Sequence, residues 1–196
     1  MFRPLLFSSL IASAVVIFCG AIFWAAKWPA SYHRVAAGIG SAQSQYLIGV
    51  DLIREGKTTP ARFFEGVEYV QRASEQGHVK AARVLADLAL ENGEIDRALG
   101  LYQEASRRGD SDAVMALSNI FSSFASPPYP GVAKDDERAE RYAGFIKRFY
   151  FGGECWPVDN FDEIFPLPPF SLPSREEQDR LRKEGCRPRA GWFGFP

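Results

Sequence analysis

The side chains that could perform chemistry are few and scattered in this sequence. The chain has two histidines, His33 and His78, and three cysteines among its 196 residues. Neither histidine belongs to a cluster with the ligand spacing of a zinc site. A Gly-x-Ser-x-Gly turn, a phosphate-binding glycine loop and a zinc-protease motif are all missing from the sequence. We therefore predict no catalytic, metal-binding or cofactor-binding residues, no cofactor, and a protein that is not an enzyme.

Adjacent carboxylates occur twice, as Asp135 with Asp136 and as Glu176 with Glu177. Carboxylates are frequent acids and bases in catalysis. Both pairs, however, are expected in the first turns of helices, where negative charge is favoured by the helix dipole. This position accounts for them without an acid–base role.

Cys155 and Cys186 flank a proline-rich segment near the end of the chain. They are either two buried free thiols or a disulfide. In the chain-entropy model, a bridge closing a loop of this size contributes on the order of 3–4 kcal/mol, and it persists only in an oxidising compartment. We predict the disulfide Cys155–Cys186.

The segment near the N-terminus is uniformly uncharged, since residues 5–26 read LLFSSLIASAVVIFCGAIFWAA. A helix of about 20 apolar residues spans a bilayer, and Lys27 and Trp28 follow the run, as interfacial residues often do. A cleaved signal peptide, a lipoprotein signal at Cys19 and a buried core helix are the alternatives. An uncleaved anchor within residues 1–30 fits best. The flanking positive charges do not decide its orientation, and the predicted disulfide favours repeats on the periplasmic side.

The central part of the chain repeats. Gly40, Gly77 and Gly109 separate units in which a first helical pattern, at 41–56, 78–93 and 110–124, precedes a second one. Such a period is typical of a solenoid, whereas an ordinary helical bundle would not keep its glycines and alanines in register. We predict an all-α solenoid of three antiparallel helix pairs over residues 41–150. Its predicted buried residues are Ala81, Leu85, Ala98, Tyr102, Ala113 and Leu117.

The stretch GVAKDDERAERY at 131–142 resembles the Sel-one-like repeat, a relative of the tetratricopeptide repeat. The order Gly131, Val132, Lys134, Asp135, then Arg138 and Ala139, then Tyr142 carries this resemblance. DRALGLYQEASRRG at 96–109 matches the same second helix. Two departures stand out, because unit two lacks the Gly-Val loop and unit three carries the insertion SSFASPPYP between its helices.

Residues 151–196 form a proline-rich C-terminal segment that is too apolar for a linker. We expect it to lie along the last repeat and cap it, with a short helix at 174–185. FDEIFPLPPFSLP at 161–173 is similar to an uncharacterised C-terminal domain family that follows Sel-one-like repeats in bacterial proteins.

The predicted function is binding of another protein, since solenoids present extended surfaces and a net charge of -1 does not attract nucleic acid. The resemblance implies an immunity protein that neutralises a type VI secretion toxin such as a lipase, held in the bacterial inner membrane by a single span. The alternative is an envelope scaffold or regulatory adaptor. Arg83, Asp87 and Asn119 are the candidate partner-binding residues; a solvated face is the other interpretation of these three.

Overall fold

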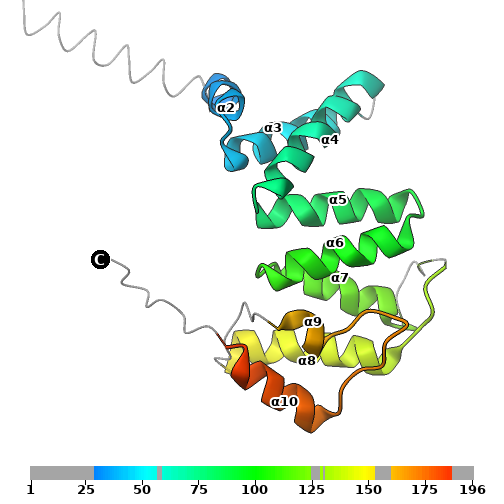
Figure 1. The fold of residues 1–196 in the computed structure, drawn as a ribbon. Coiled ribbons are helices and arrows are strands. Elements are labelled where there is room, and N and C mark those ends of the chain that lie inside the picture. Colours follow the sequence, from blue (N-terminus) through cyan, green and yellow to red (C-terminus); the bar gives the residue numbers. More distant parts are fainter. Residues whose placement is uncertain (1–28, 57–58, 125–128, 130, 153–159, 187–196) are drawn as a thin grey trace, which may run out of the picture.

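The computed structural model describes residues 29–56, 59–124, 129, 131–152 and 160–186, and the regular elements in these ranges are helices (Figure 1). The helices are α2 (Pro29–Gly38), α3 (Ala42–Glu55), α4 (Pro60–Glu75), α5 (Val79–Glu91), α6 (Ile95–Arg107), α7 (Ser111–Phe121), α8 (Asp136–Gly152), α9 (Phe161–Ile164) and α10 (Arg175–Glu184). The prediction of an all-α protein is confirmed. Among the described residues, no helix combines the length and the apolar character needed to cross a membrane, and the predicted span 5–26 lies outside them.

Three helix pairs form the body of the protein. Helix α3 packs against α4, α5 against α6, and α7 against α8, while α4 against α5 and α6 against α7 join the pairs into a stack (Figure 1). These pairs are units one, two and three of the predicted solenoid. The six residues predicted to be buried are all buried.

Glycines in the left-handed conformation follow α4, α5 and α6. Gly77, Gly93 and Gly109, which follow α4, α5 and α6, have φ angles of +85°, +77° and +102°. Glycine adopts these angles without a steric penalty. The chain therefore reverses within a few residues after each helix.

Unit one is built on direct contact between two helix backbones. A Cβ atom placed on Gly49 of α3 would lie 2.8 Å from the carbonyl oxygen of Gly66, and one on Gly66 of α4 would lie 2.7 Å from the carbonyl oxygen of Gly49. The two glycines therefore face each other where α3 and α4 cross. A side chain at either position would push the helices apart.

Helix α2 is an element that the sequence analysis did not predict. It packs on α3 through the buried Ala36 and Ala37, and the side chain of Gln45 donates a hydrogen bond of 3.2 Å to the Ala37 carbonyl oxygen. Small side chains on this face bring α2 close to α3. The stack thus begins with a single helix rather than with a pair.

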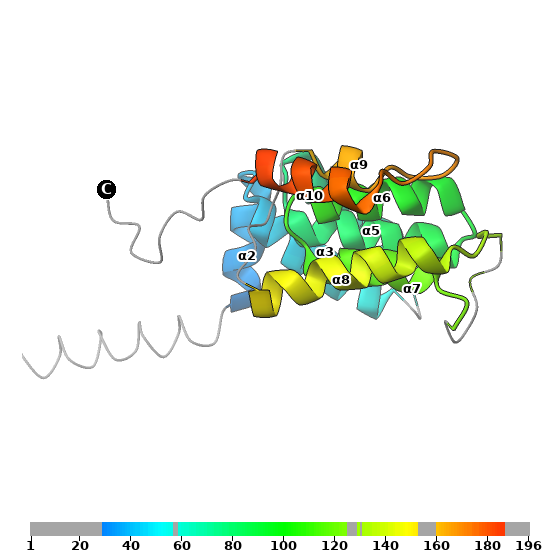
Figure 2. The ribbon, with the colours of Figure 1, turned by 90° about the horizontal axis from the view of Figure 1, so that it is seen from below.

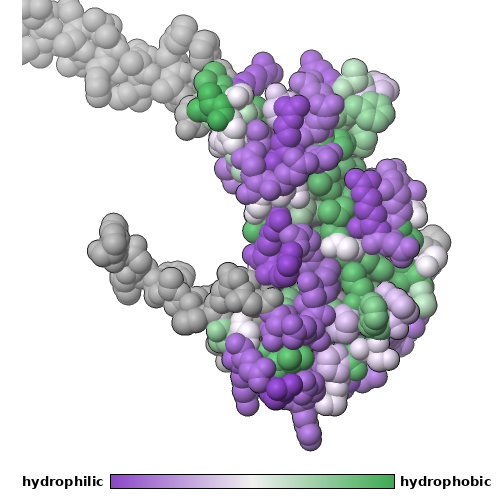
Figure 3. Space-filling model, viewed as in Figure 1, coloured by the Kyte–Doolittle hydropathy of each residue, from purple (hydrophilic) through white to green (hydrophobic). Residues whose placement is uncertain are grey.

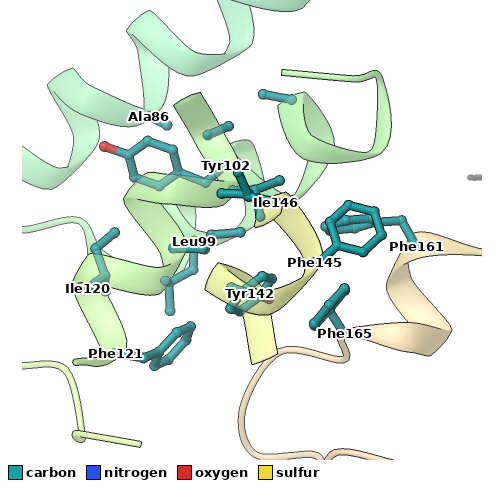
Figure 4. Close-up of a cluster of buried hydrophobic side chains, with 14 of the residues drawn as sticks. Ala86, Leu99, Tyr102, Ile120, Phe121, Tyr142, Phe145, Ile146, Phe161 and Phe165 are labelled. Carbon is teal, nitrogen blue, oxygen red and sulfur yellow. The ribbon is translucent and has the colours of Figure 1, made fainter. Parts of the chain in front are cut away.

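The C-terminal tail, described over residues 160–186, lies across the second helices of units two and three. Phe161 and Phe165 are fully buried and point from the tail toward Tyr142 and Phe145 of α8 (Figure 4). The rings of Phe165 and Tyr142 stack with centroids 4.5 Å apart. Gln103 of α6 donates a hydrogen bond of 2.6 Å to the Phe165 carbonyl oxygen. The tail is therefore an integral part of the core.

The extended part of the tail is fixed by arginines of α8. Arg138, itself buried, donates to the carbonyl oxygens of Pro166 and of Phe170, the latter at 2.9 Å. Arg141 donates to the Pro173 carbonyl oxygen at 2.5 Å. Prolines lack a backbone N–H, and within the segment the Phe170 N–H donates to the Leu167 carbonyl oxygen at 3.1 Å. The arginines bind carbonyl oxygens of this segment and hold it against α8. Ser174 then caps α10 by accepting from the Glu177 backbone N–H at 3.1 Å.

Candidate functional site

The first helices of units two and three, α5 and α7, carry the predicted partner-binding residues. We call Arg83, Asp87, Asp112, Met115 and Asn119 the first-helix face. Helix α9 packs against α6, and α10 packs against α9. Figure 2 shows α9 and α10 on one side of the molecule and α7 on the other. The described part of the C-terminal tail, residues 160–186, therefore leaves the first-helix face uncovered.

Arg83 is the centre of an ion-pair network between the two units. Its Nε lies 3.0 Å from an oxygen of Asp110, and its terminal nitrogens lie 3.7 Å from Asp87 and 3.5 Å from Asp112. Asp110 is also the N-cap of α7 and accepts from the backbone N–H groups of Asp112 and Ala113. The Arg83 side chain is only 23% exposed. It thus links α5 to the start of α7, and contact with a partner stays a prediction for this residue.

Asp87 is held by Tyr102 from the paired helix. The Tyr102 hydroxyl donates a hydrogen bond of 2.7 Å to Asp87. Burial raises the pKa of the Asp87 carboxyl above its ordinary value, although the Tyr102 hydrogen bond and Arg83 oppose this shift. Burial and the neighbouring carboxylate also raise the pKa of Tyr102 far above the physiological range. Asp87 therefore presents a partly desolvated carboxylate at the edge of the first-helix face.

Asn119 and Met115 lie one turn apart on the outside of α7. Asn119 is exposed, and Met115 is 48% exposed, whereas Ala113 and Leu117 point into the core. The sequence analysis named Asn119 and missed Met115. The exposure of Met115 could have been predicted from the sequence. Met115 lies midway between two residues predicted to be buried and must face away from both.

His78 sits where unit one meets unit two. Its ring stacks on Tyr46 of α3 with centroids 4.4 Å apart, and its Nε2 lies 2.9 Å from the side-chain oxygen of Gln43. Burial lowers the pKa of His78, and the nearby charge of Lys80 lowers it further. This histidine was predicted to start a helix, and it does so as the N-cap of α5.

No group of three or more His, Cys, Asp and Glu side chains within the described ranges could hold a metal ion. His33 of α2 is partly buried, and its Nδ1 lies 3.2 Å from the Ser44 hydroxyl of α3. Asp135 and Asp136 act in helix capping and turn contacts. Asp135 accepts from the Arg138 backbone N–H at 2.9 Å, and Asp136 accepts from the Ser123 backbone N–H at 2.7 Å.

Cys186 follows α10 and is disulfide-bonded. Cys155 lies outside the described residues. The pairing of Cys155 with Cys186 therefore stays a prediction.

Two solved structures from Pseudomonas aeruginosa are similar to this architecture. No protein-family model matches the sequence, and a search of curated proteins finds no match. Immunity protein PA5088 from Pseudomonas aeruginosa is similar in structure, with a TM-score of 0.57 and 22% sequence identity over 70% of this chain and 52% of that one. Pseudomonas aeruginosa 5086 (PA5086) gives a TM-score of 0.58 and 25% identity over 70% and 51% of the two chains.

A Sel1 repeat protein from Oxalobacter formigenes, with 19% identity over 81% of this chain and 64% of that one, gives a TM-score of 0.49. This chain spans about half the length of the two Pseudomonas structures. The fold of this chain is a stack of helix pairs that is similar to the two Pseudomonas structures.

Proposed function

We propose that this protein binds another protein through the first-helix face and acts as an immunity protein that neutralises a secreted bacterial toxin. The proposal rests on one observation: the described part of the C-terminal tail covers one side of the stack and leaves the other side accessible. The C-terminal tail occupies the second helices α6 and α8, while Met115 and Asn119 on α7 stay accessible. The fold shared with immunity protein PA5088 adds support.

The chemistry of the first-helix face defines the partner surface that would fit it. Met115 is an exposed flexible apolar side chain in the middle of α7. Asp87 and Asp112 flank Arg83, and their side chains are 46% and 71% exposed. Interface energy concentrates in a few desolvated contacts. A complementary partner therefore offers an apolar pocket for Met115 with basic side chains beside it.

The finer features of the proposal come from the sequence. Residues 5–26 anchor the chain in the bacterial inner membrane, and the repeats at 41–150 together with the capping segment at 151–196 lie in the periplasm. The toxin is a type VI secretion effector, such as a lipase that attacks membranes from the periplasm. The resemblance of residues 161–173 to the C-terminal domain that follows Sel-one-like repeats in bacterial proteins belongs to the same proposal.

The test is protection of cells from the toxin encoded beside this gene. That toxin is directed to the periplasm with the wild-type protein, with the variant Met115→Glu, or with the control variant Phe64→Glu. Phe64 is also an exposed apolar side chain, 66% exposed, but it lies on α4. Loss of a central contact costs about 2 kcal/mol or more. We expect Met115→Glu to abolish protection and Phe64→Glu to retain it.

Two results would contradict the proposal. Killing in the presence of abundant wild-type protein would reject the immunity role and favour the scaffold or adaptor role. Full protection by Met115→Glu would keep the immunity role and reject the first-helix face as the binding surface.

A further inference from the structure

Helix α2 exposes apolar side chains on the surface that faces away from the stack. Val35 is 68% exposed and Ile39 is 82% exposed. Ile39 follows the last residue of α2, and its backbone N–H donates to the Val35 carbonyl oxygen at 3.1 Å, so it continues the last turn of the helix on the side of Val35. Apolar surface gathers over α2 in Figure 3, at the upper left. Among the large exposed hydrophobic residues of the described ranges, Val35 and Ile39 are the two that lie closest in sequence, with Ile39 directly after the end of α2.

The described residues outside α2 leave this side of the helix open. Ala36 and Ala37 already provide the contact with α3. A Cβ atom built on Gly38 or Gly40 would meet no atom within 4 Å. Arg34, which is exposed next to Val35, adds a cation to the same region. A helix with apolar residues beside a basic residue is typical of segments that lie at a membrane surface, where the guanidinium reaches the phosphates.

The position of α2 in the chain identifies what covers this surface. The uncharged run ends at residue 26, and α2 begins at Pro29. The intervening residues span no more than about 10 Å even when fully extended. A helix of 10 residues is about 15 Å long and can lie along the bilayer surface.

We infer that α2 is a membrane-surface helix, whose Val35 and Ile39 enter the headgroup region of the bilayer while Arg34 contacts lipid phosphates. This inference rests on the proposed anchor at residues 5–26. It places unit one next to the membrane and the first-helix faces of units two and three further along the stack. The solenoid is then held against the bilayer at two points rather than tethered by a flexible stalk.

Site-specific photocrosslinking on the full chain tests the inference. A benzophenone amino acid replaces Ile39, Met115 or Val15 in separate samples, and the protein is reconstituted in vesicles of phosphatidylethanolamine with a minority of phosphatidylglycerol. After illumination, mass spectrometry detects lipid adducts. We expect adducts at position 39 and at position 15, which lies within the proposed anchor, and none at position 115.

The outcomes separate the two proposals. Adducts at position 15 without adducts at position 39 would overturn the surface helix and leave the anchor in place. No adducts at position 15 would overturn the anchor, and the inference would fall with it. A crosslink from position 39 to a second copy of the chain instead of lipid would assign this surface to self-association and overturn the inference.

Discussion

At the scale of single residues, Arg83 is a predicted partner-binding residue whose side chain forms ion pairs within the protein. It contacts carboxylates on its own helix and on the next unit. Asp110, one of those carboxylates, is almost fully buried. A buried carboxylate that loses its cation is costly. Arg83 therefore contributes to the stability of the junction between units two and three.

The variant Arg83→Ala should lower the free energy of unfolding by about 2 kcal/mol, because Asp110 keeps its backbone donors but loses its charge-assisted hydrogen bond. Chemical denaturation in detergent measures the loss. Arg62→Ala is the matched control, since Arg62 pairs with Glu55 and both side chains are about half exposed. Exposed pairs contribute about 0–1 kcal/mol. Equal effects of the two variants would show that Arg83 has no special structural role.

His78 predicts a dependence of stability on pH. Its pKa is lowered in the folded protein, chiefly by burial. The unfolded chain therefore binds a proton more readily as the pH falls below about 6.5, the ordinary histidine value. Stability is then fully present above that pH and is lost progressively as the pH falls through the folded pKa.

The variant His78→Phe keeps an aromatic ring against Tyr46 but cannot be protonated. We expect the melting temperature of the wild type to fall more than that of His78→Phe between about pH 7.5 and about pH 5.5, a range that brackets the histidine value. His33 is present in both proteins and serves as an internal control. Parallel pH profiles would mean that His78 is not the group responsible.

At the scale of helices, the crossing of α3 and α4 depends on Gly49 and Gly66. A methyl group at Gly49 would lie 2.6 Å from a Val70 methyl carbon as well as close to the backbone of α4. Both contacts are shorter than packed atoms allow. The two helices therefore tolerate no side chain at this point.

Gly49→Ala and Gly66→Ala should each destabilise the protein by about 1–3 kcal/mol or more through overpacking. Gly100→Ala is the control, because Gly100 lies inside α6 with no atom within 4 Å of the added methyl group. That variant should gain about 0.8 kcal/mol from higher helix propensity. Thermal unfolding distinguishes the expected loss of stability in Gly49→Ala and Gly66→Ala from the expected gain in Gly100→Ala. A stabilising Gly49→Ala would contradict the backbone contact.

Most of the helix pairs could be predicted from the sequence, while the contacts between distant segments could not. Ala81 and Leu85 recur as Ala113 and Leu117, and such small and large residues at helical spacing specify which side faces the core. By contrast, the approach of Phe165 to Tyr142 is set by tertiary packing. The pairing of Arg83 with Asp110, 27 residues away, has the same origin. Helix α2 was missed because its ten residues are short of the length that makes periodicity convincing.

At the scale of the whole molecule, the C-terminal tail joins units two and three into one cooperative block. It contacts α6 through Gln103 and α8 through Arg138. Most solenoid units contact only their sequence neighbours. Here a segment from the end of the chain bridges two units. Unit one has no equivalent clamp in the described part of the chain and is joined to unit two through α4 and α5.

The variant Phe165→Ala should lower the free energy of unfolding by about 3–5 kcal/mol, since it removes a fully buried ring. Phe170→Ala is its matched control within the tail, because Phe170 is 69% exposed. Surface changes of this kind stay within about 0.5 kcal/mol. Hydrogen exchange should show lost protection in α6 and α8 as well as in the tail. Exchange that increases in the tail alone would contradict the cooperative block.

The position of this clamp at the end of the chain also determines how the protein is made. A ribosome releases α6 and α8 before it releases Phe161 and Phe165, so the rings of Tyr142 and Phe145 lack their cover during part of synthesis. Transiently exposed apolar surface favours aggregation. The apolar surface of the repeats in the nascent chain therefore stays exposed until residues 161–165 have left the ribosome, and holdase chaperones would act on the chain in that interval.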